Sequence, residues 1–154
     1  MAQRTNIAEM LPSSYKAMYD LSIAVNKSSL TPIQKELIRI RASQVNDCGF
    51  CLDMHTSDAL SIGEKTGRIF LLNAWKESHL FSEEEKAMLA IVEEVTLIHN
   101  KGLSDATYQE AQNFFNDQEI AEIIMTAVVI NAWNRIAIST NLPFKTKQNK
   151  KYGP

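Results

Sequence analysis

The chain has 154 residues, of which 45% are apolar and 22% are charged, and its net charge is −2. This length suits one domain with a single hydrophobic core. So small a charge excludes the strong field of a nucleic-acid-binding or membrane-surface protein. No stretch approaches the roughly eighteen consecutive apolar residues of a membrane span, and the first residues lack the apolar segment of a signal peptide. We therefore expect a cytoplasmic protein that binds no nucleic acid and no membrane.

Apolar periodicity and capping signals predict seven helices, and no alternating pattern predicts a strand. In chain order the helices cover approximately residues 13–25, 31–46, 48–62, 65–77, 82–98, 104–115 and 116–140. Thr31 and Ser82 each begin a capping box. The predicted fold is all-α, with residues 1–144 in one domain and a polar, lysine-rich tail over residues 145–154.

The last predicted helix is apolar on more than one side. Such a helix is usually buried all round, either at the centre of the domain or in a subunit interface, and we expect a homo-oligomer. The run from Asn131 to Arg135 is unusual there, because buried amides and guanidinium groups require partners. It is either a structural hydrogen-bond network, which we favour, or a set of supporting contacts around a reactive site.

Both cysteines of the chain lie in one C-x-x-C pair, Cys48 and Cys51, and His55 follows four residues later. In a cytosolic chain such a pair is more often catalytic, redox-active or metal-binding than structural. Asp47 is placed to cap a helix that begins here, and residues three or four apart on a helix share one face. Cys48 would lie in the first turn, where the helix dipole and unpaired N–H groups favour the thiolate, which is the species that attacks.

Glu36 precedes Cys48 by twelve residues, which on one continuous helix would separate them by about 18 Å. If the chain turns at Asn46-Asp47 and the two helices run antiparallel, Glu36 and His55 lie at nearly the same distance from the turn. The carboxylate can then orient or charge the imidazole. This arrangement would form a carboxylate–histidine–thiol line that activates a nucleophile and moves its proton.

Zinc is the main alternative, because Cys48, Cys51, His55 and Glu36 are numerous enough to supply four ligands. Structural zinc usually draws its ligands from two separated pairs, and the sequence has no second C-x-x-C and no H-x-H. We therefore expect neither a metal nor a cofactor.

The spacing of Glu36, Cys48, Cys51 and His55 resembles the E-x(11)-C-x-x-C-x-x-x-H signature of the alkylhydroperoxidase D-like branch of the carboxymuconolactone decarboxylase superfamily. The segments LDMHTSDAL and INAWNR also look like that branch, and the resemblance covers about residues 10–143. It implies a helical fold, assembly into trimers or hexamers, and a thiol-dependent peroxidase.

By this resemblance, Cys51 would attack a hydroperoxide and become a sulfenic acid. Cys48 would supply the proton and then form a Cys48–Cys51 disulfide, and His55 and Glu36 would be the proton relay. The substrate would be a small peroxide, and the reductant a thiol or a lipoyl-type protein. The helix-terminus argument instead makes Cys48 the more acidic thiol, so the two lines of reasoning differ on which sulfur ionises first.

The chain departs from the pattern of well-studied members at Phe50, where they carry a second histidine. This departure bears on the rate, the substrate and the reductant. The decarboxylase members lack the cysteine pair, so its presence argues against lactone decarboxylation. Two hypotheses compete with the peroxidase: an acid–base decarboxylase or isomerase of a cyclic lactone, and a non-enzymatic redox sensor or zinc-holding oligomer.

Overall fold

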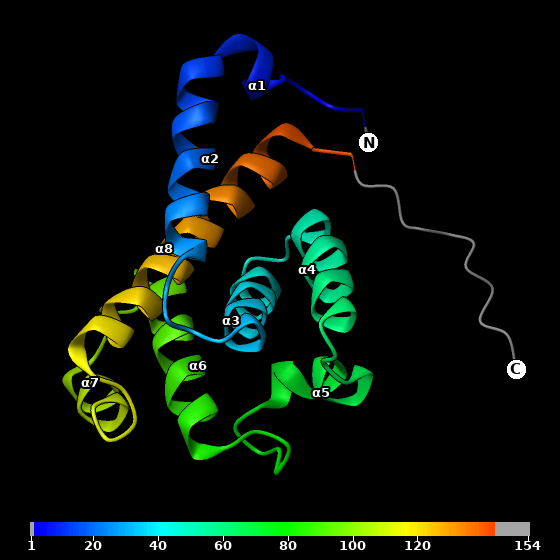
Figure 1. Ribbon diagram of the computed structural model, residues 1–154. Coiled ribbons are helices and arrows are strands. Elements are labelled where there is room, and N and C mark those ends of the chain that lie inside the picture. Colours follow the sequence, from blue (N-terminus) through cyan, green and yellow to red (C-terminus); the bar gives the residue numbers. More distant parts are fainter. Residues whose placement is uncertain (1, 144–154) are drawn as a thin grey trace, which may run out of the picture.

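The computed structural model describes residues 2–143, and within that range it contains helices and no strand. The prediction of an all-α fold is therefore confirmed. The elements, shown in Figure 1, are α1 Ile7–Met10, α2 Pro12–Asn26, α3 Pro32–Val45, α4 Gly49–Ser61, α5 Thr66–Leu71, the 3₁₀ turn η1 Leu72–Ala74, α6 Glu83–Thr96, α7 Asp105–Ala111 and α8 Asp117–Thr140. The predicted tail, residues 145–154, lies outside the described residues.

The beginning of the chain differs from the sequence-based prediction. A single-turn helix, α1, precedes α2, and the Asn6 side chain caps it by accepting a hydrogen bond from the Ala8 N–H. α2 begins at Pro12, because the fixed φ of proline suits the first helical position and its missing N–H leaves no donor unpaired. The predicted caps Ser13 and Ser14 consequently lie inside the helix.

Two predicted helices are shorter than expected. The helix predicted over residues 65–77 is α5 followed by η1, whose three-residue repeat places Leu72 and Trp75 on the same side, and both are buried. The helix predicted over residues 104–115 ends at Ala111. In both segments the helix gives way to a tighter turn that brings an apolar side chain into the core. This is an effect of tertiary packing, which local periodicity does not predict.

Both predicted capping boxes are present. The Thr31 hydroxyl accepts from the Gln34 N–H at 3.2 Å, and the Gln34 side chain accepts from the Thr31 N–H at 2.8 Å. Ser82 and Glu85 form the same pair of bonds at 3.2 and 2.9 Å. These bonds satisfy N–H groups that the first turns of α3 and α6 leave without helical partners.

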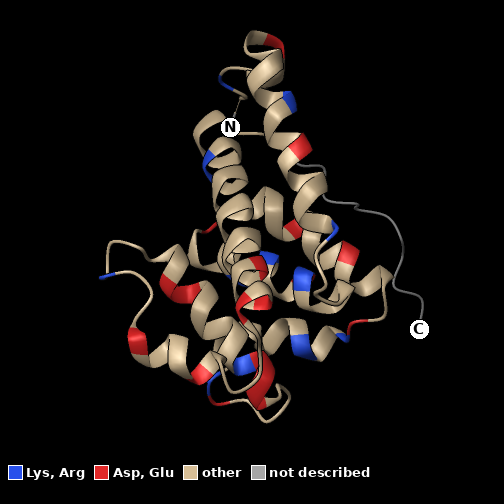
Figure 2. Ribbon diagram, turned by 60° about the vertical axis from the view of Figure 1, so that its left-hand side comes forward, with Lys and Arg blue, Asp and Glu red and all other residues tan. Residues whose placement is uncertain are grey.

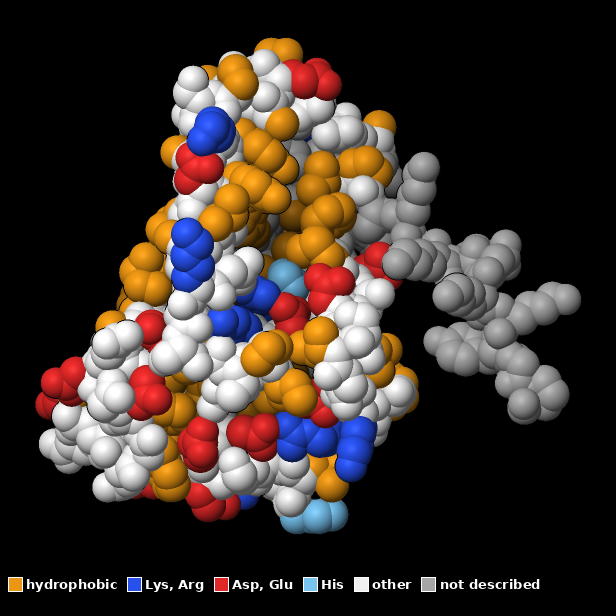
Figure 3. Space-filling view, in the orientation of Figure 1, with side chains coloured by type: hydrophobic (Ala, Val, Ile, Leu, Met, Phe, Trp, Pro, Cys, Tyr) orange, Lys and Arg blue, Asp and Glu red, His pale blue; other side chains and the backbone are white. Residues whose placement is uncertain are grey.

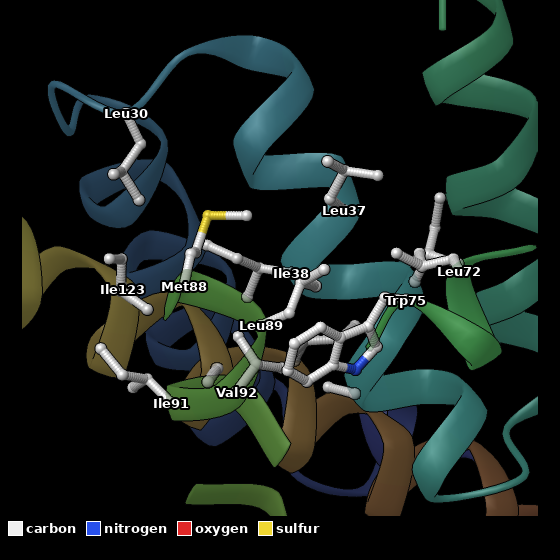
Figure 4. Close-up of a cluster of buried hydrophobic side chains, with 14 of the residues drawn as sticks. Leu30, Leu37, Ile38, Leu72, Trp75, Met88, Leu89, Ile91, Val92 and Ile123 are labelled. Atoms are coloured by element: carbon white, nitrogen blue, oxygen red, sulfur yellow. The ribbon is translucent and has the colours of Figure 1, made fainter. Parts of the chain in front are cut away.

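α3 is the helix around which the others are arranged. It packs against α4, α6, α8 and η1, and its Leu37, Ile38 and Ile40 are fully buried. The same buried cluster includes side chains from η1, from the residue that follows it, from α6 and from α8, namely Leu72, Trp75, Met88, Leu89, Ile91, Val92 and Ile123 (Figure 4). Because α3 also carries Glu36, this core fixes the position of that carboxylate relative to α4.

α8 packs against α2, α3, α4 and α6 (Figure 1). These helices bury only part of the surface of α8, since Met125, Val128 and Ile138 remain 39%, 43% and 45% exposed. By length and composition alone α8 could cross a membrane, but half of its most apolar stretch is buried inside the protein. Core helices of globular proteins share this length and composition. The contacts with four other helices identify α8 as a core helix with one uncovered side.

Charged residues are distributed over most of the elements. Figure 2 shows acidic and basic positions interspersed on the lower helices. Several of them pair across elements, for example Arg41 with Glu93 at 2.7 Å and Arg68 with Glu85 at 2.5 Å. The view agrees with the small net charge in showing no element composed mainly of basic residues among those described.

Two adjacent leucines give a direct test of this core. Leu72→Ala, at a position with no exposed surface, is expected to lower the free energy of unfolding by about 2–5 kcal/mol. The neighbouring Leu71 is 44% exposed, so Leu71→Ala should cost about 0.5 kcal/mol. Urea denaturation of both variants measures the difference, and equal losses would contradict the packing described.

Candidate active site

The turn between α3 and α4 positions the two cysteines. Asn46 ends α3, and Asp47 has a positive φ of 55°, a left-handed conformation that aspartate tolerates better than most residues. Cys48 is the N-cap residue of α4, and its N–H donates to the Ser43 carbonyl at 2.9 Å. The prediction that Asp47 caps α4 is wrong, because its backbone forms the reversal itself. Cys48 precedes the first turn that was predicted to contain it.

This reversal brings Glu36 on α3 against His55 on α4. The two side chains are buried, and His55 Nδ1 lies 2.8 Å from Glu36 Oε2. Since a carboxylate only accepts, the ring donates from Nδ1, and Nε2 is left as the nitrogen that can take up a proton. The antiparallel argument from sequence therefore predicted the right contact.

Arg39 holds the other side of the same carboxylate. It lies one turn after Glu36 on α3 and donates to Glu36 Oε1, while its second terminal nitrogen donates to the Asn26 side chain of α2. Burial raises the pKa of Glu36, but the hydrogen bond and charge of His55 and those of Arg39 outweigh it and hold the pKa below its ordinary value. Glu36 is thus a buried carboxylate that stays ionised.

Both thiols are free and buried, with Cys48 1% and Cys51 2% exposed. They interact with each other. The hydrogen bond from the Cys51 side chain is the largest influence on Cys48 and, against the effect of burial, lowers its pKa to about 7. The same bond, together with burial, raises the pKa of Cys51 above its ordinary value. The pair therefore loses its first proton near neutral pH, and the proton that remains on Cys51 is shared toward the Cys48 thiolate.

A cavity of about 400 Å³ leads to the thiols, between α2, α4, α8 and the segment before α1. Cys51 and His55 line it, whereas Cys48 does not. Most of the wall is apolar, and its larger side chains are Tyr15, Tyr19, Phe50, Met54, Val129 and Trp133. Figure 3 shows this hollow as a cluster of hydrophobic side chains with charged side chains at its lower end. The cavity suits an apolar ligand with a reactive group directed at Cys51 and His55.

A second cavity of about 370 Å³ lies on the other side of the carboxylate and is lined by Lys35, Glu36 and Ile62 among others. Arg39 and Asp58 line both cavities. The His55–Glu36 pair thus lies between the apolar cavity that contains Cys51 and a more polar cavity on the far side. Such a position suits a group that passes protons between a reaction site and solvent.

Glu36, His55 and Asp58 each offer a ligand atom, and these atoms lie within 4.8 Å of one another. Neither cysteine belongs to this group, so within residues 2–143 the geometry does not support the four-ligand zinc hypothesis, which needs both thiols. Glu36 also accepts hydrogen bonds from His55 and Arg39 on its two oxygens. A metal on Glu36 would therefore compete with these two hydrogen bonds for the carboxylate.

The Asn131–Arg135 run belongs to a buried amide network that reaches the thiols. Asn46 Nδ2 donates to Asn131 Oδ1 at 2.8 Å and to Asn134 Oδ1 at 2.9 Å, and Asn134 Nδ2 donates to Ser43 Oγ at 3.0 Å. Asn134 also interacts with both cysteines, where its side chain lowers the pKa of each. The run is therefore both a structural network and a set of contacts beside the thiol pair.

Glu36, Cys48, Cys51 and His55 were identified from the sequence, and the run that contains Asn134 was considered as a set of supporting contacts. Other supporting residues could have been found from helical spacing, because Arg39 and Ser43 lie three and seven residues after Glu36, and Asp58 lies three residues after His55. Asn26 carries no local signal, and its proximity to the site follows only from the placement of α2 beside α3.

The ionisation of Glu36 predicts a pH-dependent contribution to stability. Because its folded-state pKa is below the ordinary 4.5, the ionised carboxylate stabilises the fold above that pH, and the contribution is lost as the pH falls through the lower value. The difference in free energy of unfolding between wild type and Glu36→Gln should be constant well above pH 4.5 and shrink as the pH falls below 4.5. Urea denaturation at each pH measures it, with the exposed Glu77→Gln as control. A difference that does not change with pH would contradict this account.

The thiol pair makes a second prediction. In the reduced protein, the ultraviolet absorbance of the thiolate should rise with a midpoint near pH 7, a readout that needs no reagent to reach the buried Cys48. Cys51→Ala removes the hydrogen-bond donor and should move the midpoint toward 9.0, the ordinary value. Cys51→Ser keeps an O–H donor and should move it less. Equal midpoints in wild type and Cys51→Ala would show that Cys51 does not stabilise the Cys48 thiolate.

Comparison with known proteins places this geometry in a family. Residues 12–94 match the model of the carboxymuconolactone decarboxylase family. The uncharacterised protein YdfG of Bacillus subtilis (strain 168) is 40% identical over 139 residues, which are 90% of this chain and 95% of that protein. A solved structure of a protein of unknown function from Agrobacterium tumefaciens, suggested to be the antioxidant defence protein AhpD, is 35% identical. Its TM-score is 0.90, covering 94% of this chain and 99% of that one.

A more distant solved structure shares the fold alone. The debrominase Bmp8, in complex with 2,3,4-tribromopyrrole, has a TM-score of 0.77 and 14% identity, covering 89% of this chain and 73% of that one. One fold can therefore serve different reactions, and the residues of the site must decide between them. Three observations indicate the same family: the match to the family model, the close relatives, and the spacing of Glu36, the cysteine pair and His55. The chain belongs to the carboxymuconolactone decarboxylase family, in its alkylhydroperoxidase D-like branch.

Proposed function

We propose that the protein is a thiol-dependent peroxidase that reduces hydroperoxides through a sulfenic acid on Cys51 and a Cys48–Cys51 disulfide. The observation that carries the proposal is the apolar cavity that contains Cys51 and His55, with Cys48 behind it and the buried Glu36 on the other side of the imidazole. The close relative from Agrobacterium tumefaciens, suggested to be an antioxidant defence protein, supports a peroxidase-related role.

The first step needs the negative charge on Cys51, because this sulfur lines the cavity and Cys48 does not. The Cys48 thiolate, favoured near pH 7, takes the Cys51 proton through their shared hydrogen bond. The Cys51 thiolate then attacks the terminal oxygen of the hydroperoxide, the S–O bond forms and the O–O bond breaks. The leaving alkoxide takes its proton from the Cys48 thiol, which yields an alcohol, the Cys51 sulfenic acid and a Cys48 thiolate.

The second step forms the disulfide. The Cys48 thiolate attacks the Cys51 sulfur, the S–S bond forms and the S–O bond breaks, and the hydroxide that leaves takes a proton from the imidazolium form of His55 and becomes water. Glu36, held ionised by Arg39, stabilises a positive charge on His55 whenever the imidazole carries the additional proton. An external dithiol then returns two electrons and two protons and restores both thiols. A thiol or a lipoyl-type protein is the proposed reductant.

The assembly proposed for the chain is a homo-oligomer, a trimer or a hexamer. Met125 and Val128 on α8, and Tyr19 and Ile23 on α2, are large apolar side chains that are at least 39% exposed. Contact with another copy would remove this surface from water. Light scattering on the purified full chain gives the mass directly, and a monomer of 17.4 kDa at micromolar concentration would reject the proposal.

The decisive experiment is steady-state peroxide consumption with dithiothreitol as reductant, after a check for bound zinc. Wild type should turn over cumene hydroperoxide, and Cys51→Ser should fall to the rate of the blank while keeping its circular dichroism spectrum and melting temperature. A fully active Cys51→Ser would falsify the mechanism. Acid–base lactone chemistry that survives alkylation of both thiols would favour the decarboxylase hypothesis. Stoichiometric disulfide formation without turnover would favour a sensor.

The cavity predicts a preference for organic hydroperoxides over hydrogen peroxide. Val129→Phe places a phenyl ring in the part of the cavity that Val129 lines. Because a bulky peroxide then loses both space and apolar contacts, kcat/KM for cumene hydroperoxide should fall by about tenfold or more, while kcat/KM for hydrogen peroxide changes little. Ile138→Phe puts the same side chain on α8 at an exposed position outside the cavity and should change neither rate. Equal effects of Val129→Phe on both peroxides would show that the cavity does not select the substrate.

A further inference from the structure

We propose that Ser43 and Asn134 form a hydrogen-bond-donating cradle that stabilises the thiolate form of the Cys48–Cys51 pair. The inference deepens the proposed function, since it concerns the same thiols, but it requires only that they ionise. Ser43 was not singled out from the sequence, and Asn134 belongs to the Asn131–Arg135 run, for which a structural role was favoured over contacts beside the reactive site. Both are fully buried, on α3 and α8, at the level of the turn that carries Cys48.

The contacts hold both side chains against that turn. Asn134 Nδ2 donates to Ser43 Oγ at 3.0 Å, and Asn134 Oδ1 accepts from Asn46 Nδ2 at 2.9 Å. The Ser43 carbonyl accepts from the Cys48 N–H at 2.9 Å. The Ser43 and Asn134 side chains both act to lower the pKa of Cys51, and the Asn134 side chain acts to lower the pKa of Cys48.

The direction of every hydrogen bond in the network follows from one backbone carbonyl. The Ala127 carbonyl can only accept, so the Asn131 group that lies 2.8 Å from it must be the NH₂, which also donates to Thr96 Oγ1 at 3.0 Å. Asn131 Oδ1 is then an acceptor and takes its bond from Asn46 Nδ2. The same Asn46 NH₂ group donates to Asn134 Oδ1, so the NH₂ of Asn134 faces Ser43 and the sulfurs.

The network therefore presents donors to the thiols. One N–H of Asn134 is used by Ser43 Oγ. Among residues 2–143, no hydrogen bond to oxygen uses the second N–H of Asn134 or the hydroxyl hydrogen of Ser43. We assign these two donors to the neighbouring sulfurs, since both side chains act to lower the pKa of Cys51. A thiolate accepts such bonds far more strongly than a thiol does. A buried site that would otherwise oppose ionisation thus gains fixed dipoles that favour it.

The test is the pH profile of thiol alkylation by iodoacetamide on the reduced full chain, with mass spectrometry to identify the modified cysteine. Asn134→Leu removes the donors at similar side-chain volume and should raise the midpoint of the profile by about 1, as expected for the loss of a hydrogen bond to a charged group. Asn46 keeps its acceptor on Asn131 in this variant. Ser43→Ala removes only the hydroxyl and should raise the midpoint by about 0.5.

Thr96→Val is the matched control, because it removes a buried hydroxyl from the opposite end of the same network. It should leave the midpoint at the wild-type value, since Asn131 is still oriented by the Ala127 carbonyl. General loosening of the fold would raise alkylation rates at every pH without moving the midpoint. A true loss of thiolate stabilisation moves the midpoint and leaves the rate at high pH unchanged or higher, because a more basic thiolate is more nucleophilic.

A midpoint in Ser43→Ala equal to that of Thr96→Val would overturn the cradle, and this variant decides the matter even if Asn134→Leu fails to fold. The outcome is independent of peroxide turnover. A shifted midpoint in an inactive protein would keep the cradle and reject the peroxidase. An active peroxidase with unshifted midpoints would do the reverse.

Discussion

The reversal of the chain between α3 and α4 is the constraint on which the site depends. Asp47, in the left-handed conformation, and Cys48, the N-cap of α4, reverse the chain so that α3 and α4 run antiparallel beside each other. Residues at equal distance from the turn therefore meet. The Glu36–His55 hydrogen bond is the consequence at one end, and the burial of the thiol pair is the consequence at the other. A change in the geometry of this turn would move Cys51 and His55 together, because both are on α4, and would separate them from Glu36 on α3.

The protein opposes the cost of burying charge with local partners. An ionised carboxylate and a thiolate inside a core are unfavourable unless hydrogen bonds and opposite charges replace the lost water. Arg39 and His55 do this for Glu36, while Cys51 and Asn134 do it for Cys48. The same low-polarity surroundings that make these groups costly also make each partner effective. The apolar cavity can therefore lie directly beside a site that holds charge.

The two cysteines illustrate how acidity and access are divided. The helix-terminus argument favoured Cys48 as the more acidic thiol, and the structure agrees, although the largest cause is the hydrogen bond from Cys51. Access to the cavity belongs to Cys51. A shared proton reconciles the two, because ionisation of the pair makes the charge available to either sulfur. Phe50, which replaces a histidine of well-studied relatives, adds apolar wall to the cavity beside Cys51.

The sequence alone determined the helical class, most helix boundaries and the contact between Glu36 and His55, because these follow from local periodicity, capping and the distance of each residue from one turn. It could not determine the short 3₁₀ segment that begins at Leu72, whose tighter turn places Leu72 and Trp75 in the core. It also could not reveal that Asn134 and Ser43 meet beside the thiols, or that α2 and α8 enclose an apolar cavity over Cys51. These features join segments about ninety residues apart, and only the packing of α8 against α3 decides which of their polar groups meet.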